Sequence, residues 1–218
     1  MKTVLIVAAH PDDELLGVGG TAARHAEAGD QVYSAVMCEG ESLRYQKDVG
    51  QRAAMEHAAE VLGVKQVYPL GFPDQRLDTF TLTELIEPLE KLSEELHPNI
   101  IYCQYGGDIN RDHQLLFEAA NVAFRPLNPW IEEFLAFYTV SSSEWGYPYG
   151  FVPDTWVNIS DILEKKIQAF SCYYSEVRAY PHPRSCDALR YAAHFFGNQC
   201  CMDSAEPFKT IRRIRRCI

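Results

Sequence analysis

The sequence has no long apolar run. The apolar segment at its N-terminus, TVLIVAA, covers only residues 3–9 and ends in charged residues. A membrane-spanning helix needs about 20 apolar residues, and a signal peptide ends at a small-residue cleavage site. The segment is typical of a buried strand, so we predict a cytoplasmic protein without a membrane span.

Basic residues are also scarce. The chain has 20 Lys and Arg against 30 Asp and Glu, which gives a net charge of −10. General nucleic-acid binding needs a basic surface that neutralises phosphates, so this class of function is excluded. The only basic run is KTIRRIRRC at 209–217. It is interpreted as a solvated helix face, with a docking patch for a partner as the alternative.

The cysteines lack the spacing of a disulfide or zinc framework. They are seven in number, at positions 38, 103, 172, 186, 200, 201 and 217. The number is odd, and the adjacent pair Cys200 and Cys201 is not a C-x-x-C arrangement. We therefore expect reduced thiols, several of them buried as small hydrophobic residues.

The sequence does contain a regular alternation of strand and helix patterns. Strands are predicted at 3–9, 31–38, 65–72, 99–105 and 134–140, and helices at 15–29, 51–64, 81–97, 113–124, 161–176 and 186–197. Pro88 is expected to kink the third helix or to mark a second start. This alternation predicts an α/β fold with a mostly parallel sheet and helices on both faces. No linker or repeat divides the chain, so residues 1–218 are predicted to form one domain, irregular from about residue 141.

Polar side chains follow two of the predicted strands, where ligands bind in such sheets. His10, Asp12 and Asp13 come directly after the first strand, and His113 comes shortly after the strand at 99–105. Two imidazoles and one carboxylate suit zinc, or a first-row metal such as iron, with positions left open for water. If His10 and Asp13 bind the metal, Asp12 points elsewhere and can act as the general base on the bound water.

The same residues also have a structural interpretation. Asp12 or Asp13 could cap the helix that begins near Leu15, since acidic residues are favoured at a helix N-terminus. A lone histidine such as His113 is more often structural than a ligand. From the residues alone, both interpretations stay open.

The G-V-G-G sequence at 17–20 invites comparison with a nucleotide-binding loop. The G-x-G-x-x-G spacing is absent, and three acidic residues precede the glycines where a pyrophosphate would have to lie. We reject a dinucleotide site.

The segment AHPDDELLGVGG, with RDHQLL downstream, closely resembles the LmbE-like (PIG-L) family of zinc-dependent de-N-acetylases. The resemblance extends over most of the chain, through the segments QRAAMEHAAEVLGV, LGFPDQRLD, GGDINRDH, FVPDTWVNIS, KIQAFSCYYSEVRAYPHPRS and AEPF. It implies the LmbE-like fold, a Rossmann-like sandwich in a single domain.

The resemblance also implies roles for individual residues. His10, Asp13 and His113 would bind Zn²⁺, with Fe²⁺ as the alternative metal. Asp12 would be the base that deprotonates the water on the metal, whose pKa zinc lowers toward about 7. Asp112 is expected to orient His113 as a hydrogen-bond acceptor. Glu14 is expected to support the turn and the start of the helix.

Three further positions match residues on the substrate side of the family's site. Arg52 matches an arginine beside the active site, and Asp74 matches a carboxylate that contacts sugar hydroxyls. Glu41 is a weaker match to another acidic residue. For each of the three, a surface salt bridge is an equally good explanation.

The chain departs from the family pattern at Asn110. Many members carry H-x-x-H where this chain reads Asn110-Arg111-Asp112-His113. An asparagine can donate a hydrogen bond to an oxyanion but cannot act as an acid. The proton for the leaving amine would then come from Asp12 or from His182 in YPHPRS, although an ordinary loop residue is the simpler interpretation of His182.

We interpret the chain as a zinc-dependent N-deacetylase that acts on a small N-acetylated sugar, sugar nucleotide or glycoconjugate. Another zinc amidase or esterase is one alternative. A domain that only binds metal or glycan is the other, because Asn110 replaces the usual histidine. A homo-oligomer is compatible with the sequence.

Overall fold

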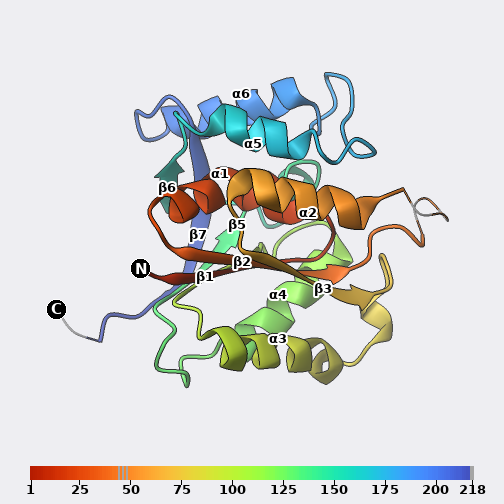
Figure 1. Ribbon diagram of the computed structural model, residues 1–218, viewed down its shortest axis with the longest axis vertical. Helices are drawn as coiled ribbons and strands as arrows, with labels where there is room; N and C mark the ends of the chain where they lie inside the picture. Colours follow the sequence, from red (N-terminus) through yellow and green to blue (C-terminus); the bar gives the residue numbers. More distant parts are fainter. Residues whose placement is uncertain (44, 46, 48, 217–218) are drawn as a thin grey trace.

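The computed structural model describes residues 1–43, 45, 47 and 49–216 (Figure 1). Its centre is a sheet of seven strands in the order β3-β2-β1-β4-β5-β7-β6. The strands are β1 (Thr3–Ala8), β2 (Gln31–Cys38), β3 (Gln66–Phe72), β4 (Ile100–Gln104), β5 (Glu133–Phe137), β6 (Thr155–Asn158) and β7 (Ala205–Arg213). The predicted mostly parallel sheet is confirmed, because β1 to β5 pair in parallel and only β7 runs against its neighbours.

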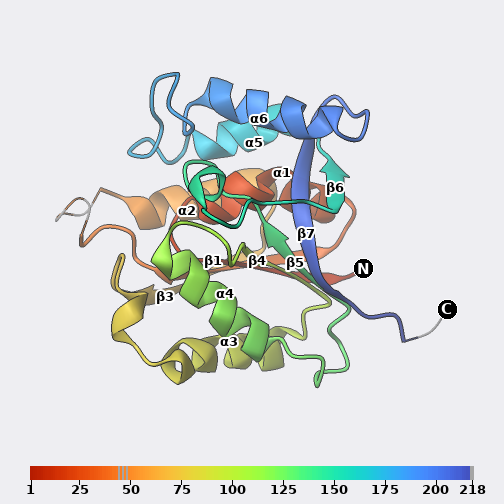
Figure 2. The same ribbon diagram turned by 180° about the vertical axis from the view of Figure 1, so that it is seen from behind.

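Helices cover both faces of the sheet, as predicted (Figures 1 and 2). One face carries α3 and α4, and the other carries α1 and α2 with α5 and α6 in a further layer beyond them. The helices are α1 (Asp13–Glu27), α2 (Gln51–Leu62), α3 (Leu82–Leu96), α4 (Arg111–Ala123), α5 (Leu163–Phe170) and α6 (Cys186–Asn198), with 3-10 turns η1 (Leu77–Thr79) and η2 (Ser143–Trp145). Within the described part of the chain, no helix has the length and apolar character needed to cross a membrane.

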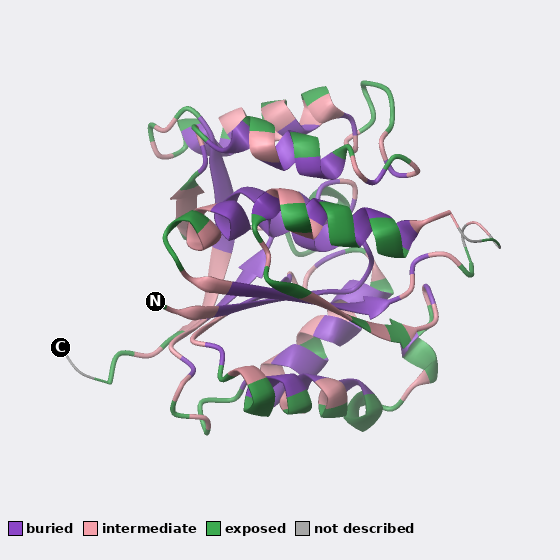
Figure 3. Ribbon diagram, in the orientation of Figure 1, coloured by how far each residue is buried: buried purple, intermediate pink, exposed green. Residues whose placement is uncertain are grey.

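The burial of the first strands explains their composition. Strands β1 and β2 are buried along almost their whole length, because helices cover both faces of the sheet there (Figure 3). Strands of this kind carry continuous apolar runs, as TVLIVA does in β1. Strand β3 lies at the edge of the sheet and is only partly buried.

The strand β1 lies where the order of the sheet reverses. It pairs with β2 on one side and with β4 on the other. The chain builds outward from β1 to β3, then crosses back to form β4 and β5 on the other side. The loops after β1 and β4 therefore meet at the carboxyl edge of the sheet, where open α/β sheets bind ligands.

The glycines of G-V-G-G lie inside α1 and allow it to pack closely. A Cβ on Gly17 would overlap the ring of Phe137 in β5, and one on Gly20 would come within 2.7 Å of Ile159. Larger side chains would push α1 away from both contacts. The position of these glycines in a buried helix agrees with the rejection of a phosphate-binding loop.

The prediction of a helix face for the basic run was wrong. Residues 209–213 of this run belong to β7, which pairs antiparallel with β5 and, in its first part, with β6. Backbone pairing with β5 fixes the extended conformation, and Arg213 forms an ion pair with Glu133 of β5 at 2.9 Å. The local charge pattern carries no information about these distant partners. Cys217 lies outside the described residues.

Pro88 lies inside the continuous helix α3, so the second helix start, one of the two predicted outcomes, does not occur there. Thr81 and Glu84 form a capping box that fixes the start of α3. Leu85, Leu89 and Leu92 then bury one face of the helix on both sides of the proline. Packing of this apolar stripe outweighs the backbone hydrogen bond that a proline removes.

Cysteine pairing is absent among the residues that the structure describes. The six described cysteines are free thiols, and Cys38 and Cys103 are buried. Burial raises the pKa of both thiols well above the usual value. Both pack in the apolar core, as predicted, and the thiol of Cys38 also donates a hydrogen bond to Oδ2 of Asp112 at 3.6 Å.

Candidate active site

The loop after β1 holds its acidic residues through the geometry of a single turn. Asp12 adopts a left-handed conformation with φ of 93°, and α1 begins at the next residue, Asp13. The backbone carbonyl of Asp12 accepts hydrogen bonds from the N–H groups of Leu15 and Leu16. Glu14 accepts a hydrogen bond from the backbone N–H of Asp12 at 3.1 Å and another from the hydroxyl of Tyr173. The turn thus directs Asp12 and Asp13 differently.

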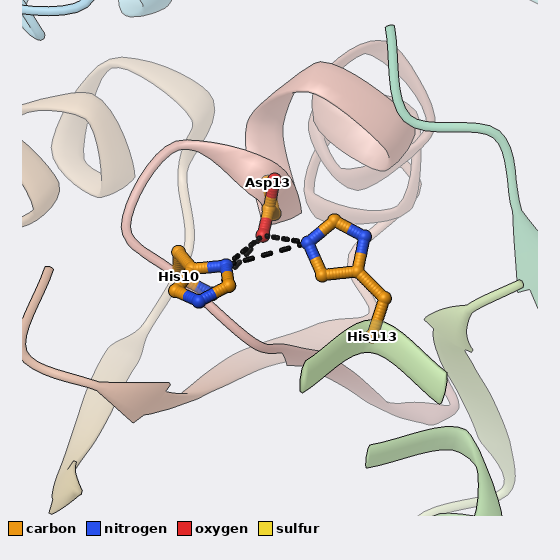
Figure 4. A group of neighbouring side chains, drawn as sticks. All are labelled: His10, Asp13 and His113. Atoms are coloured by element: carbon orange, nitrogen blue, oxygen red, sulfur yellow. Dashed lines mark hydrogen bonds and ion pairs between the residues drawn. The ribbon is translucent and has the colours of Figure 1, made fainter. Parts of the chain in front are cut away.

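Three buried side chains meet at the switch point of the sheet (Figure 4). Nδ1 of His10 and Nε2 of His113 lie 3.2 Å from the same oxygen of Asp13, and 3.3 Å from each other. Two ligands at about 2.0–2.1 Å from zinc lie about 3.3 Å apart across a tetrahedral angle. The three atoms therefore have the spacing of a zinc ligand set, and the residues present fit such a metal.

The outer nitrogen of each histidine faces a carboxylate. Oδ2 of Asp112 lies 3.1 Å from Nε2 of His10, and Oδ2 of Asp108 lies 3.2 Å from Nδ1 of His113. Such contacts fix the imidazole orientation and leave the inner nitrogen for a metal. The prediction that Asp112 orients its neighbour His113 was wrong, because Asp112 contacts His10 and Asp108 contacts His113. Consecutive residues of a helix point in different directions and do not face one group.

Asp13 is held by a side chain from the neighbouring strand. Gln104, the last residue of β4, donates a hydrogen bond from Nε2 to Oδ2 of Asp13 at 2.7 Å. Its Oε1 accepts from the backbone N–H of Ala9 at 2.8 Å. Burial raises the pKa of Asp13, but the nearby His113 and His10 lower it well below its usual value. The carboxylate is thus kept ionised, as a metal ligand must be.

Asp12 lies beside this cluster and is fully buried. Its Oδ2 forms an ion pair with Nη1 of Arg184 at 3.0 Å, and its Oδ1 accepts no hydrogen bond from any residue that the structure describes. Burial raises the pKa of Asp12 well above its usual value, although the charge of Arg184 opposes the shift. An efficient general base has a pKa near the operating pH, so a raised pKa makes this carboxylate a better base at neutral pH.

Arg184 connects Asp12 to a second buried acid, Glu176. Its Nη1 lies 2.8 Å from Oε2 of Glu176, and its Nε donates to the hydroxyl of Ser141 at 2.9 Å. Oε1 of Glu176 accepts a hydrogen bond from Gln51 at 2.8 Å. Arg184 is therefore held from three sides where it meets Asp12.

A cavity of about 270 Å³ opens onto the cluster. Its lining includes two of the predicted metal ligands, His10 and His113, and two other predicted residues, Asn110 and His182. Five other lining residues were not predicted from the sequence: Ser141, Ser142, Glu176, Arg178 and Arg184; Trp145 completes the lining. The last 80 residues of the chain thus supply most of this wall.

Asn110 has a structural role at the start of α4. Its Oδ1 accepts a hydrogen bond from the backbone N–H of Asp112 at 2.9 Å, which makes it the N-cap of the helix. Its Nδ2 donates to Oε1 of Gln75 at 3.3 Å, and Nε2 of Gln75 lies 2.9 Å from Nε2 of His10. Both ends of the Asn110 amide therefore contact the protein, and the residue also lines the cavity.

The three predicted substrate-side residues lie in different environments. Arg52 is exposed on α2 and pairs with Glu56 at 3.1 Å, one turn away, and it does not line the cavity. Glu41 accepts hydrogen bonds from the backbone N–H groups of Val49 and Gln51 and also lies outside the lining. Asp74 is buried, with Oδ1 3.6 Å from Nε2 of His10. The structure brings only Asp74 to the cluster.

Several residues that contact the site had no role predicted from the sequence. Asp108, Glu176 and Arg184 lie in loops within segments that resemble the family, and Gln104 lies at a strand end. Gln104 alone stands in a place that could have been noticed, because it ends a strand at the switch point.

Asp112→Asn is expected to lower the affinity for zinc by about 10- to 100-fold, since carboxylates that orient a ligand histidine contribute on this scale. The asparagine retains an oxygen for the hydrogen bond that Asp112 accepts from the N–H of Leu77 at 3.1 Å. Competition with a chromophoric zinc chelator measures the change. The matched control is Asp78→Asn, an exposed aspartate in η1. Equal affinities for the two variants would contradict the orienting role.

The family model described as PIG-L, GlcNAc-PI de-N-acetylase, matches residues 5–124, more than half of the chain. The uncharacterized deacetylase YaiS of Escherichia coli is 30% identical over 131 residues, which are 58% of this chain and 70% of that protein. The diacetylchitobiose deacetylase of Thermococcus kodakarensis is 27% identical over 190 residues, 81% of this chain and 70% of that protein.

Solved structures share the fold over the whole chain. The conserved protein TT1542 from Thermus thermophilus has a TM-score of 0.81 at 24% identity, covering 100% of this chain and 98% of its own. The 4-carboxy-2-hydroxymuconate hydratase GalB from Pseudomonas putida has a TM-score of 0.79 at 21% identity, covering 100% of both chains. At these identities the likeness concerns the fold alone.

Proposed function

The chain belongs to the PIG-L family, and from this premise we propose that it is a metal-dependent hydrolase that removes the acetyl group from an N-acetylated sugar or sugar conjugate. The observation that carries the proposal is the buried triangle of His10, Asp13 and His113 (Figure 4), with Asp12 next to Asp13 and with both histidines in the lining of the cavity. The deacetylases among the relatives support this reaction class.

His10, Asp13 and His113 would hold the metal, for which we propose zinc, with Fe²⁺ as the alternative. A bound zinc ion would polarise the amide carbonyl and lower the pKa of water. The protein contributes the fixed ligand geometry, since Asp112, Asp108 and Gln104 each contact one of the three ligands. Three protein ligands leave a position open, as in catalytic zinc sites.

Asp12 would act as the general base of the reaction. It takes a proton from the water that attacks the amide carbonyl, and Arg184 holds the carboxylate in place. The C–N bond then breaks, acetate leaves, and the amine nitrogen takes up a proton. Because Asn110 cannot supply that proton, we assign it to Asp12 or to His182.

His182 is the second group available for the proton. It lines the cavity, and its Nδ1 accepts a hydrogen bond from the backbone N–H of Arg184 at 3.0 Å. That hydrogen bond leaves Nε2 as the proton-bearing nitrogen. If His182 is the acid, His182→Ala is expected to lower kcat by about 10²-fold, the lower end of general acid catalysis. Asn110→Ala serves as comparison, and an unchanged kcat in His182→Ala would leave Asp12 alone in this role.

Removal of the metal is expected to abolish acetate release, and added Zn²⁺ or Fe²⁺ is expected to restore it. The assay measures acetate from N-acetylglucosamine, diacetylchitobiose and UDP-N-acetylglucosamine, before and after treatment with a chelator. Full activity in protein shown to be free of metal would overturn the mechanism.

Two results would point to other activities on the same fold. Metal binding without acetate release from any N-acetylated sugar would favour a binding domain. Because the fold neighbours include a hydratase, water addition to an unsaturated hydroxy acid is the second activity to assay.

A further inference from the structure

One wall of the cavity carries three basic side chains, of which only Arg178 has no part in the proposed chemistry. This wall comes from the segment after α5, where Arg178, His182 and Arg184 all line the cavity. The protein as a whole carries a net charge of −10, so a cationic surface at this position is unusual for the molecule. The three side chains differ in the ion pairs and hydrogen bonds that they already form within the protein.

Arg184 is neutralised within the protein. It lies within ion-pair distance of two buried carboxylates, Asp12 at 3.0 Å and Glu176 at 2.8 Å. Its Nε is taken by the hydroxyl of Ser141. Arg184 therefore has little charge to offer a ligand.

Arg178 is in the opposite situation. Its guanidinium donates from Nη1 to the backbone carbonyls of Ser175 and Val177, and it forms no ion pair with an Asp or Glu among residues 1–43, 45, 47 and 49–216. Carbonyl contacts hold the side chain without neutralising its charge. The guanidinium is thus exposed, positioned and available to an anion at the cavity.

Two further hydrogen-bond donors lie in the same lining. Nε2 of His182 carries a proton because Nδ1 accepts from the backbone of Arg184. The hydroxyl oxygen of Ser141 accepts a hydrogen bond from Nε of Arg184, so the hydroxyl proton of Ser141 points away from Arg184. The acid in the lining, Glu176, is buried and already contacts Arg184, Tyr45 and Gln51. This side of the cavity therefore favours a negatively charged ligand group, which accepts hydrogen bonds, over a cation.

We propose that Arg178 is a specificity-determining residue that binds an anionic substituent, a carboxylate or a phosphate, carried by the N-acetylated sugar. A planar guanidinium suits both groups, because its parallel N–H donors match two oxygens of either. The inference rests on the proposed deacetylase function and names its substrate class. The sugar would enter with its amide toward His10 and His113 and its charged substituent toward Arg178.

The kinetic test compares charged and neutral substrates in the zinc-loaded protein. N-acetylglucosamine 1-phosphate carries a phosphate, N-acetylmuramic acid carries a carboxylate, and N-acetylglucosamine carries neither. Arg178→Ala is expected to raise KM for a charged substrate by about 10-fold, equivalent to about 1.4 kcal/mol, with kcat little changed. KM for N-acetylglucosamine should stay the same, and Arg178→Lys should fall between wild type and Arg178→Ala.

The matched control is Arg125→Ala, which removes a surface arginine that pairs with Glu90 and does not line the cavity. It should leave all three KM values unchanged. A loss confined to the phosphate sugar or to the carboxylate sugar supports the proposal and identifies the group. Equal effects on charged and neutral sugars, or no effect of Arg178→Ala, would overturn it.

Calorimetric binding separates this proposal from the deacetylase function. Glucosamine 1-phosphate and muramic acid contain no acetamide to hydrolyse, so their binding does not depend on catalysis. Arg178→Ala should weaken the binding of at least one of them about 10-fold, whereas glucosamine should bind wild type and variant alike. An anion bound only by the metal would be insensitive to Arg178→Ala, which would contradict the proposal. If the chain releases no acetate from any sugar, only the deacetylase function fails, and the binding result still decides the role of Arg178.

Discussion

Asp12→Asn is expected to lower kcat by about 10²- to 10⁴-fold while the zinc content of the protein stays unchanged. The amide cannot take a proton from water, but it retains the size of the carboxyl group. Asparagine also tolerates the left-handed backbone of this position, where φ is 93°. Arg184 keeps its second partner, Glu176, so its position should survive the change.

The measurement combines initial rates of acetate release with metal analysis of the same samples. Asp78→Asn is the matched control, since it makes the same chemical change at an exposed aspartate in η1. A variant that loses both zinc and activity would show that Asp12 supports the metal site. Intact activity with Asp12→Asn would exclude Asp12 as the base.

Lys166→Met is expected to destabilise the fold by about 3–5 kcal/mol, because it leaves a buried carboxylate without its counter-charge. Nζ of Lys166 lies 2.6 Å from Oε1 of Glu206 in β7 and donates to the carbonyl of Leu16 in α1. Glu206 also accepts hydrogen bonds from the backbone N–H groups of Gly20 and Thr21. One buried ion pair thus joins α1, α5 and the distant strand β7.

The neighbouring Lys165 provides a matched control. It forms an exposed ion pair with Glu27 at 2.8 Å, so Lys165→Met should cost less than about 1 kcal/mol. Urea unfolding at neutral pH compares the two variants. The double variant Lys166→Met with Glu206→Gln should be more stable than Lys166→Met alone, because it no longer buries an unpaired carboxylate. Similar costs for Lys165→Met and Lys166→Met would refute the role assigned to the buried pair.

The sequence alone determined those features of the protein that depend on residues close together in the chain. Buried parallel strands carry continuous apolar runs, and β1 and β2 were recognisable for that reason. The alternation of strands with amphipathic helices then placed His10, Asp13 and His113 after strands, at the edge where such sheets bind ligands. The residues of the acidic turn left a metal site and a helix cap open, and the family resemblance favoured the metal site.

The tertiary structure decided which distant residues meet. The switch point between β1 and β4 brings Asp112 to His10 and Asp108 to His113, whereas the order of residues had suggested the pair Asp112 and His113. The first part of the basic run became part of strand β7 because β5 pairs with residues 208–213 of that strand. No local pattern reports such pairing, since each partner lies far away in the chain.

The same limit applies to the wall of the cavity. Arg178 and Arg184 stand in a loop whose side chains had no predicted role, and the packing of α5 against α1 and α2, with α6 against α5 and β7, places that loop over the acidic turn. By itself, the sequence predicted the candidate metal ligands, because two histidines and a carboxylate follow strands whose ends can meet at one edge of a sheet. The partners that hold Asp12 and the charge that would meet a substrate depended on contacts between segments more than 100 residues apart, which only the tertiary structure decided.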